Sequence, residues 1–186
     1  RHGFELEQII APLISEFHII SKEKGLGFHW ITSKLSIHSD PRLLRRILQN
    51  LLSNAIRYTP EGKVLLSIKR HGGNLRIQVW DTGIGIEEDQ LDRIFDEFHR
   101  LDNIDHSFEK GLGLGLSIVQ RLCRLLDHPI KVESIQGKGS VFSIDIPLAK
   151  APKKLLDEKE ASSLLKQEKS RLIACIDNEL QIIQGM

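Results

Sequence analysis

The stretch Trp80-Asp81-Thr82-Gly83-Ile84-Gly85-Ile86 places an acidic residue and two glycines directly after a strand-like run of alternating apolar residues. Glycines let the backbone come close to a bound molecule, and a carboxylate at the end of a buried strand can accept a hydrogen bond from an exocyclic amine such as that of adenine. In isolation the same residues are equally typical of an ordinary turn after a strand. The stretch becomes informative through two others, one upstream and one downstream.

Upstream, residues 40–58 have the pattern of an amphipathic helix that begins at Asp40-Pro41, with Asp as N-cap and Pro at the first helical position. Asn50 and Asn54 are four residues apart, so their amides project from one face of this helix. Amide oxygens are neutral hard ligands that suit Mg²⁺ when water and phosphate oxygens complete its shell, and Arg57 can neutralise phosphate charge. The alternative is that these polar side chains only form the solvated face of the helix.

Downstream, Gly111, Gly113 and Gly115 come at the start of a helix that we predict over residues 114–126, with Lys110 beside them. Backbone N–H groups near the start of a helix bind phosphate, with help from the helix dipole. The spacing differs from the dinucleotide fingerprint, and no Gly-x-x-x-x-Gly-Lys-Ser/Thr occurs, which excludes a P-loop. By themselves the glycines are also typical of a flexible hinge.

The rest of the first 148 residues alternates between helical and strand-like patterns. We predict a helix over 4–24, strands over 28–32 and 35–38, a hairpin around the turn 71–74, a short helix over 87–95, and a last strand pair over 130–134 and 140–146. Residues 99–111 are polar with little periodicity, which predicts a loop. We expect Phe95 and Phe98 to be packing anchors at its base.

The composition limits the classes of function. The chain of 186 residues has a net charge of +1, so there is no electrostatic case for binding nucleic acid or an anionic membrane. We interpret Cys123 and Cys175 as small buried hydrophobic residues in a reducing compartment rather than redox groups or ligands. No apolar stretch approaches the ~20 residues that span a bilayer, and no signal peptide is present. A chain that starts at Arg1 and stops just after an apolar strand is expected to be a piece of a longer protein.

Taken together, four motifs resemble the N, first glycine, F and second glycine boxes of sensor histidine kinases. They are Asn50-x-x-x-Asn54, Asp81-x-Gly83-x-Gly85, Phe95-x-x-Phe98 and Gly111-x-Gly113-x-Gly115-Leu116. Ser39-Asp40-Pro41 and the run from Asn54 to Thr59 strengthen the match, and Gly137-Lys138-Gly139-Ser140-x-Phe142 resembles the family's final glycine-rich turn. The resemblance covers roughly residues 1–148 and is very specific because the motifs occur jointly.

The resemblance implies an α+β fold, a two-layer α/β sandwich in which helices pack on one face of a mixed sheet and a flexible lid covers ATP. It implies that Asn50 and Asn54 are the catalytic pair that holds Mg²⁺ and the phosphates, and that Asp81 binds the adenine amine. The other implied nucleotide contacts form two groups. Phosphate and lid-hinge contacts are expected from Arg57, Arg100, Lys110, Gly111, Gly113 and Gly115. Contacts in and around the base pocket are expected from Tyr58, Gly83, Gly85, Ile86, Leu116 and, through water, Ser140.

One position helps to choose among related ATPases. The gyrase, mismatch-repair and heat-shock chaperone relatives place a Glu four residues before the second Asn, as general base for water, and here that position is Asn50. A pocket without a base for water suits transfer to a better nucleophile such as imidazole, with catalysis by positioning and charge neutralisation. The implied activity is that of a protein histidine kinase. The alternatives are a non-catalytic nucleotide-binding regulatory module and an ATP hydrolase.

The family's phosphoacceptor helix, with His followed by Glu/Asp-Leu-Arg-x-Pro, has no counterpart in the 186 residues. The expected partner is therefore the dimerisation and phosphoacceptor domain of the parent protein, whose histidine receives the γ-phosphoryl group in two-component signal transduction. Because the dimer-forming helices belong to that domain, we expect this chain to be a monomer and its parent a homodimer. The expected location is the cytoplasm, whether or not the parent is anchored in a membrane.

Residues 149–170 are rich in Lys, Glu and Ser and are expected to form a charged linker, whereas residues 171–186 resemble the first strand of a receiver domain. There, Asp177-Asn178 stands where the family usually has two adjacent acids, so the metal pocket is one charge short unless Glu179 substitutes. The resemblance implies a hybrid sensor kinase that passes its phosphoryl group to a receiver domain or response regulator. The alternative is a chance apolar strand with an acidic end.

Overall fold

The computed structural model of this chain describes residues 1–98 and 114–149. All of them belong to one unit of the chain, which runs from Arg1 to Lys150. The predictions made for Arg100, Lys110, Gly111 and Gly113, and those for the linker and the receiver-like segment, lie outside the described residues.

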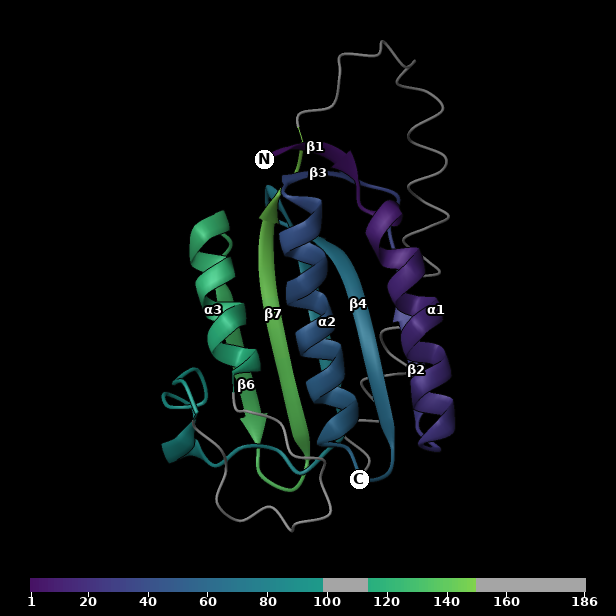
Figure 1. Cartoon of the computed structure of the whole chain (residues 1–186), viewed down its shortest axis with the longest axis vertical. Helices are drawn as coiled ribbons and strands as arrows, with labels where there is room; N and C mark the ends of the chain where they lie inside the picture. The colour runs from purple at the N-terminus through teal and green to yellow at the C-terminus, as the bar shows by residue number, and fades with distance from the viewer. Residues whose placement is uncertain (99–113, 150–186) are drawn as a thin grey trace. The chain divides into compact units, whose positions relative to one another are not determined.

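The centre of the unit is a five-stranded mixed sheet in the strand order β2-β4-β5-β7-β6 (Figure 1). Its strands are β2 (Gly27–Ile31), β4 (Lys63–His71), β5 (Asn74–Asp81), β6 (Ile130–Ile135) and β7 (Gly139–Pro147). Strands β2 and β4 are parallel, and the other three neighbouring pairs are antiparallel. The predicted hairpin is confirmed, because His71 pairs with Asn74 across a two-residue Gly-Gly turn, a loop length that suits a tight hairpin.

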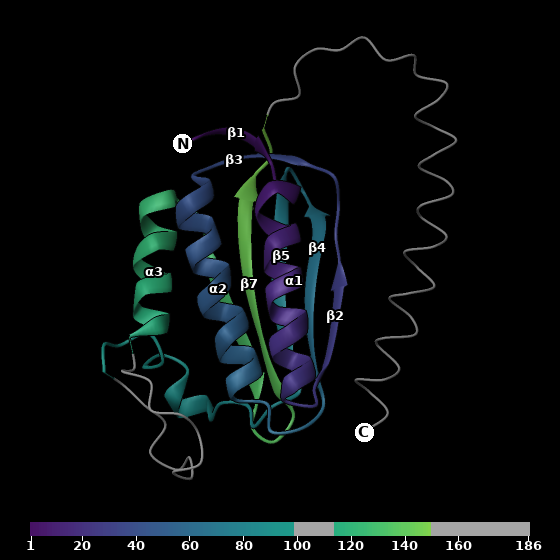
Figure 2. The same cartoon turned by 45° about the vertical axis from the view of Figure 1, so that its right-hand side comes forward.

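Three helices cover one face of this sheet, as the two views in Figures 1 and 2 show. They are α1 (Glu7–Glu23), α2 (Pro41–Arg57) and α3 (Gly115–Leu126). Alternate residues of β4, such as Val64 and Leu66, point to the helices and are fully buried. Cys123 of α3 joins this core, and burial raises the pKa of its thiol to about 12, which fits the predicted inert role. The predicted two-layer α/β sandwich is confirmed.

A small second sheet corrects the prediction of a helix over residues 4–24. Residues His2–Glu5 form strand β1, which pairs antiparallel with β3 (Ser36–Ser39), and α1 begins only at Glu7. Phe4 is buried opposite Ile37, so a pairing with a distant segment overrides the local helical period. Leu148 forms a β-bridge with Ile37, which ties the end of β7 to the same sheet.

The helix predicted over residues 87–95 is also wrong. Only Glu88–Gln90 form a 3-10 helix, labelled η1, and the chain continues in turns. The spacing of the backbone bonds explains this, because the N–H groups of Gln90, Arg93 and Asp96 each donate to the carbonyl three residues before them, at 2.9–3.0 Å. Residues 1–98 and 114–149 contain no helix that is both long enough and apolar enough to cross a membrane.

Asp40 caps the N-terminus of α2, as the sequence predicts. Its Oδ1 accepts from the backbone N–H groups of Arg42 (2.9 Å) and Leu43 (3.0 Å), and the bond from Leu43 is the largest cause of a lowered Asp40 pKa. We expect Asp40→Ala to lower the free energy of unfolding by about 1 kcal/mol, because two donors at the helix start lose their acceptor. Urea denaturation measures this, and exposed Asp92→Ala is the control that should change stability little. Equal stability of the two variants would contradict the capping role.

Candidate active site

A row of cross-strand neighbours crosses one end of the sheet on the face that the helices cover. In the strand register, Val64 of β4 pairs with Asp81, Asp81 pairs with Ser140, and Ser140 pairs with Ser134 of β6. Side chains that are paired across strands lie on the same face, about 5 Å apart at Cβ. The row therefore places one carboxylate and two hydroxyls side by side in an otherwise apolar layer.

Asp81 is the ionisable group of this row and is only partly exposed. Burial raises its pKa to about 6, although hydrogen bonds from the backbone N–H groups of Gly83 and Ser140 act in the opposite direction. The bond from Gly83 N–H to Asp81 Oδ1 measures 2.9 Å. A carboxylate that is desolvated but has acceptor capacity left is suited to receive a hydrogen bond from a ligand amine.

The turn after Asp81 is fixed to two other segments. The N–H of Ile84 donates to the carbonyl of Tyr58 (3.2 Å) at the end of α2, and the N–H of Gly137 donates to the carbonyl of Ile84 (2.7 Å). These contacts leave no room for a side chain at the glycines, since a Cβ at Gly83 would overlap the Tyr58 carbonyl and one at Gly85, where φ is +68°, would overlap that of Ile135. The glycines of this turn are thus required by close backbone approach.

The two asparagines of α2 meet the start of α3. A Cβ placed on Gly115 would lie 3.2 Å from Asn50 Oδ1 and 3.7 Å from Asn54 Nδ2. Asn50 Nδ2 donates to the Arg46 carbonyl one turn earlier, at 2.8 Å, which leaves its Oδ1 as the atom that faces Gly115. The sequence predicted all three residues for the site, and the structure brings them together.

Two amide oxygens fit a hydrated Mg²⁺ whose remaining ligands are water and phosphate, but they are too few for a site made by protein alone. In residues 1–98 and 114–149 no three His, Cys, Asp or Glu side chains gather where they could hold a metal ion. A metal ion at Asn50 and Asn54 would therefore need its remaining ligands from water or from a bound anion.

The other predicted residues within the described ranges have three kinds of surroundings. Arg57 and Tyr58 are half-buried at the end of α2, and Ile86 and Ser140 are buried. Leu116 packs against the hydrophobic core, as does Phe95. The prediction that Phe98 is a packing anchor is wrong, because 69% of its surface is exposed.

Two residues that the sequence did not single out also hold the site in place. Lys24 donates from Nζ to the carbonyls of Ile56 (2.5 Å) and Arg57 (2.9 Å), so a positive charge lies at the C-terminus of α2. Ser134 accepts from the N–H of Ile86 at 2.9 Å. Neither had a sequence signal, because each acts across more than 30 residues of chain.

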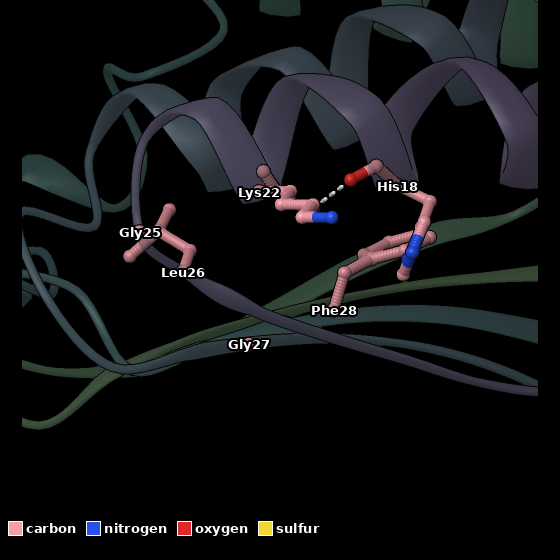
Figure 3. Close-up of a pocket in the computed structure, with 7 residues that line it drawn as sticks. His18, Lys22, Gly25, Leu26, Gly27 and Phe28 are labelled. Carbon is pink, nitrogen blue, oxygen red and sulfur yellow. Dashed lines mark hydrogen bonds between the residues drawn. The ribbon is translucent and has the colours of Figure 1, made fainter.

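A shallow pocket lies elsewhere, between the last turn of α1 and β2 (Figure 3). The close-up shows His18 and Phe28 at one end and Gly25 and Leu26 at the other. Its lining is mainly apolar and includes none of the predicted site residues. The chemistry of the row at Asp81, rather than this concavity, defines the candidate site.

A fold of three helices on a mixed sheet, with this carboxylate and these amides at one end, defines a class of ATPase. The chain belongs to the histidine kinase-, DNA gyrase B-, and HSP90-like ATPase family, whose model matches residues 39–150. It is 36% identical over 159 residues to the autoinducer 2 sensor kinase/phosphatase LuxQ of Vibrio vulnificus, which is 81% of this chain and 19% of that protein. It is 39% identical over 149 residues to the sensor histidine kinase RcsC of Escherichia coli, which is 78% of this chain and 16% of that protein.

Two solved structures of histidine kinases are also similar to this chain. Full-length ShkA in complex with AMPPNP matches with a TM-score of 0.70 and 32% identity over 80% of this chain and 31% of that one. The histidine kinase ThkA in complex with the response regulator TrrA matches with a TM-score of 0.65 and 25% identity over 79% and 41% of the two chains. The resemblance to sensor histidine kinases is therefore confirmed. The chain spans about a fifth or less of the length of the curated relatives named above.

Proposed function

We propose that this chain binds Mg²⁺-ATP and transfers the γ-phosphoryl group to a histidine of a separate phosphoacceptor domain. The observation that carries the proposal is the juxtaposition at one end of the fold of a desolvated acceptor, Asp81, with the paired amides Asn50 and Asn54 at the start of α3. The first suits an adenine amine, and the second suits a metal-bound phosphate chain. The ShkA relative was solved with an ATP analogue, which supports the same ligand class here.

Within the proposal, each of these residues has a separate role in binding the nucleotide. Asp81 accepts from the adenine amine, and Ser140 stands beside it. Asn50 and Asn54 would hold the metal ion beside the phosphates. Mg²⁺, when bound with ATP, neutralises charge that develops on the transferred group. Arg57 at the end of α2 contributes positive charge to the phosphates. Arg100, Lys110, Gly111 and Gly113 stay proposed contacts.

Transfer is favoured over hydrolysis by the chemistry of residue 50. An amide such as Asn50 cannot take a proton from water, because its nitrogen and oxygen are not basic near neutral pH. The structure adds that Asn50 Nδ2 is already bonded to the Arg46 carbonyl. A neutral imidazole needs no such base, since its ring nitrogen is itself a nucleophile.

The proposed partners follow from this reaction. A phosphoacceptor domain of the parent supplies the histidine, residues 149–170 form a linker, and residues 171–186 begin a receiver domain. ThkA was solved in complex with the response regulator TrrA, which supports a response regulator or receiver domain as the later acceptor. We propose that the chain alone is a monomer, that its parent is a homodimer, and that it works in the cytoplasm, where ATP is abundant.

The test is phosphotransfer from labelled ATP by the full chain to the separately produced phosphoacceptor domain of the parent. We expect label on the acceptor histidine that depends on Mg²⁺ and is lost in Asn54→Asp, because a negative charge replaces a neutral ligand beside the phosphates. ATP binding without any transfer would instead support a regulatory module. Repeated release of phosphate without an acceptor would support a hydrolase.

The affinity for ATP should also depend on pH through Asp81. Its folded-state pKa is about 6, and only the ionised carboxylate accepts a hydrogen bond with both oxygens. We therefore expect binding to weaken progressively as pH falls from about 8 to about 5, with the change centred near or below 6. Calorimetric titration measures this, and Asp81→Asn is the control that reports titration of the ATP phosphates alone. The same pH profile for wild type and variant would contradict the assignment.

A further inference from the structure

Ser134 has a side chain whose hydrogen-bonding capacity is completely used. Its Oγ accepts from the backbone N–H of Ile86 at 2.9 Å, donates to the carbonyl of Gly139 at 2.9 Å, and lies 2.9 Å from Oγ of Ser140. A serine hydroxyl has one hydrogen to donate and two lone pairs to accept. Because the hydrogen is committed to Gly139 and one lone pair to Ile86, Ser140 must be the donor in the third contact.

This fixes the direction of the Ser140 hydroxyl. Its hydrogen points to Ser134, so the side chain can offer only oxygen lone pairs to anything that enters beside Asp81. Ser140 and Asp81 are directly paired across β7 and β5, on the same face of the sheet. Two acceptors thus stand next to each other, which favours a ligand or bridging water that donates and disfavours one that presents an oxygen.

We infer that Ser134 is a positioning residue that sets base selectivity, so that 6-amino purines are accepted and 6-oxo purines are rejected. The inference rests on the nucleotide site proposed above and adds a residue that does not touch the base. Ser134 acts through Ser140, by holding that hydroxyl as an acceptor. Without Ser134, the Ser140 hydrogen is released and can donate either to Asp81 or to a 6-oxo group.

The experiment titrates ATP and inosine triphosphate, which differ in the 6-amino and 6-oxo groups, into the full chain and its Ser134→Ala variant. We expect ATP to bind roughly fivefold more weakly and inosine triphosphate to bind more tightly, each by about the worth of one hydrogen bond. Opposite changes for two ligands cannot come from general damage to the fold, which weakens both.

Ser143→Ala is the matched control. Ser143 is also buried on β7 and also bonds a side chain, Gln78 Nε2 at 3.0 Å, but it lies on the opposite face of the sheet. Its ratio of the two affinities should equal that of the wild type. Ser134→Thr keeps a hydroxyl and should keep the wild-type ratio, which covers the case in which Ser134→Ala does not fold.

The outcomes separate this inference from the proposed function. A wild type that binds ATP through Asp81, with an unchanged affinity ratio in Ser134→Ala, overturns the role of Ser134 and leaves the nucleotide site intact. A changed ratio in Ser134→Thr or in Ser143→Ala also overturns it. A wild type that binds neither nucleotide overturns both.

Discussion

The Asp81→Asn variant should bind ATP about 10- to 100-fold more weakly than the wild type, because one carboxylate oxygen becomes an NH₂ group. Loss of a charged acceptor typically costs about 1.5–3 kcal/mol. Asp81 Oδ1 already accepts from Gly83 N–H, so the amide nitrogen of Asn is expected to take the other position, where a donor would face the donor on the base. Calorimetry with Mg²⁺-ATP measures the loss.

The same variant should make the ligand-free domain more stable at neutral pH. A carboxyl whose folded pKa is about 6 instead of 3.8 favours the folded state when protonated, and this contribution is lost as pH rises through 6. A shift of about two units corresponds to at most ~3 kcal/mol. Since Asp81 is partly exposed, we expect a gain of about 1 kcal/mol in Asp81→Asn at pH 7.

Weaker ATP binding combined with higher stability in Asp81→Asn would show that Asp81 serves ligand binding rather than the stability of the fold. The gain in stability should vanish near pH 4, where the wild-type carboxyl is neutral in the folded protein. A variant that is both less stable at pH 7 and unchanged in ATP affinity would show that Asp81 serves the turn and not a ligand.

The Gly139→Ala variant should lose about 3 kcal/mol of unfolding free energy, which is the largest change in stability that we predict. Gly139 has a φ of +121°, and a Cβ there would overlap the backbone carbonyl of Asp81 and lie 2.9 Å from the Cα of Thr82. Because both obstacles are backbone atoms at the end of β5, neither can rotate away as a side chain could. Denaturation in urea measures the loss, and binding of ATP should fall with it.

Substitutions at two other glycines distinguish the cost of a positive φ from the cost of a steric overlap of the added Cβ. Gly137 has a φ of +77° but nothing within 4 Å of its Cβ position, so Gly137→Ala should cost about 1–2 kcal/mol from conformation alone. Gly73 has open space and no positive φ, and Gly73→Ala should change stability by less than about 0.5 kcal/mol. Equal losses at Gly139 and Gly137 would show that the overlap with β5 is relieved by movement.

The sequence predicted the parts of the fold that local rules decide. Asp40 caps α2 because Asp and Pro act within one turn of helix, and the hairpin of β4 and β5 forms where the alternation and the Gly-Gly turn predict it. The errors come from contacts between distant segments. Strand β1 exists because Phe4 pairs with Ile37, and no window of neighbouring residues contains that information.

The candidate site shows the same division. Asp81, Asn50, Asn54 and Gly115 could be selected from the sequence because their motifs jointly resemble a known family, and the structure brings the last three together. Lys24 and Ser134 are ordinary residues in ordinary contexts, and only the folded chain shows that they hold the end of α2 and the hydroxyl of Ser140.

Within the unit of residues 1–150, the sheet of β1 and β3 lies at the N-terminal end of α2 (Figure 1), whereas the turn after Asp81 is bonded to Tyr58 at the C-terminal end of α2. With 17 residues at 1.5 Å each, α2 separates the two ends by about 25 Å. A fluorophore or a surface-immobilisation tag joined at Arg1 would therefore leave the nucleotide end unobstructed. Surface-based binding assays can use this orientation directly.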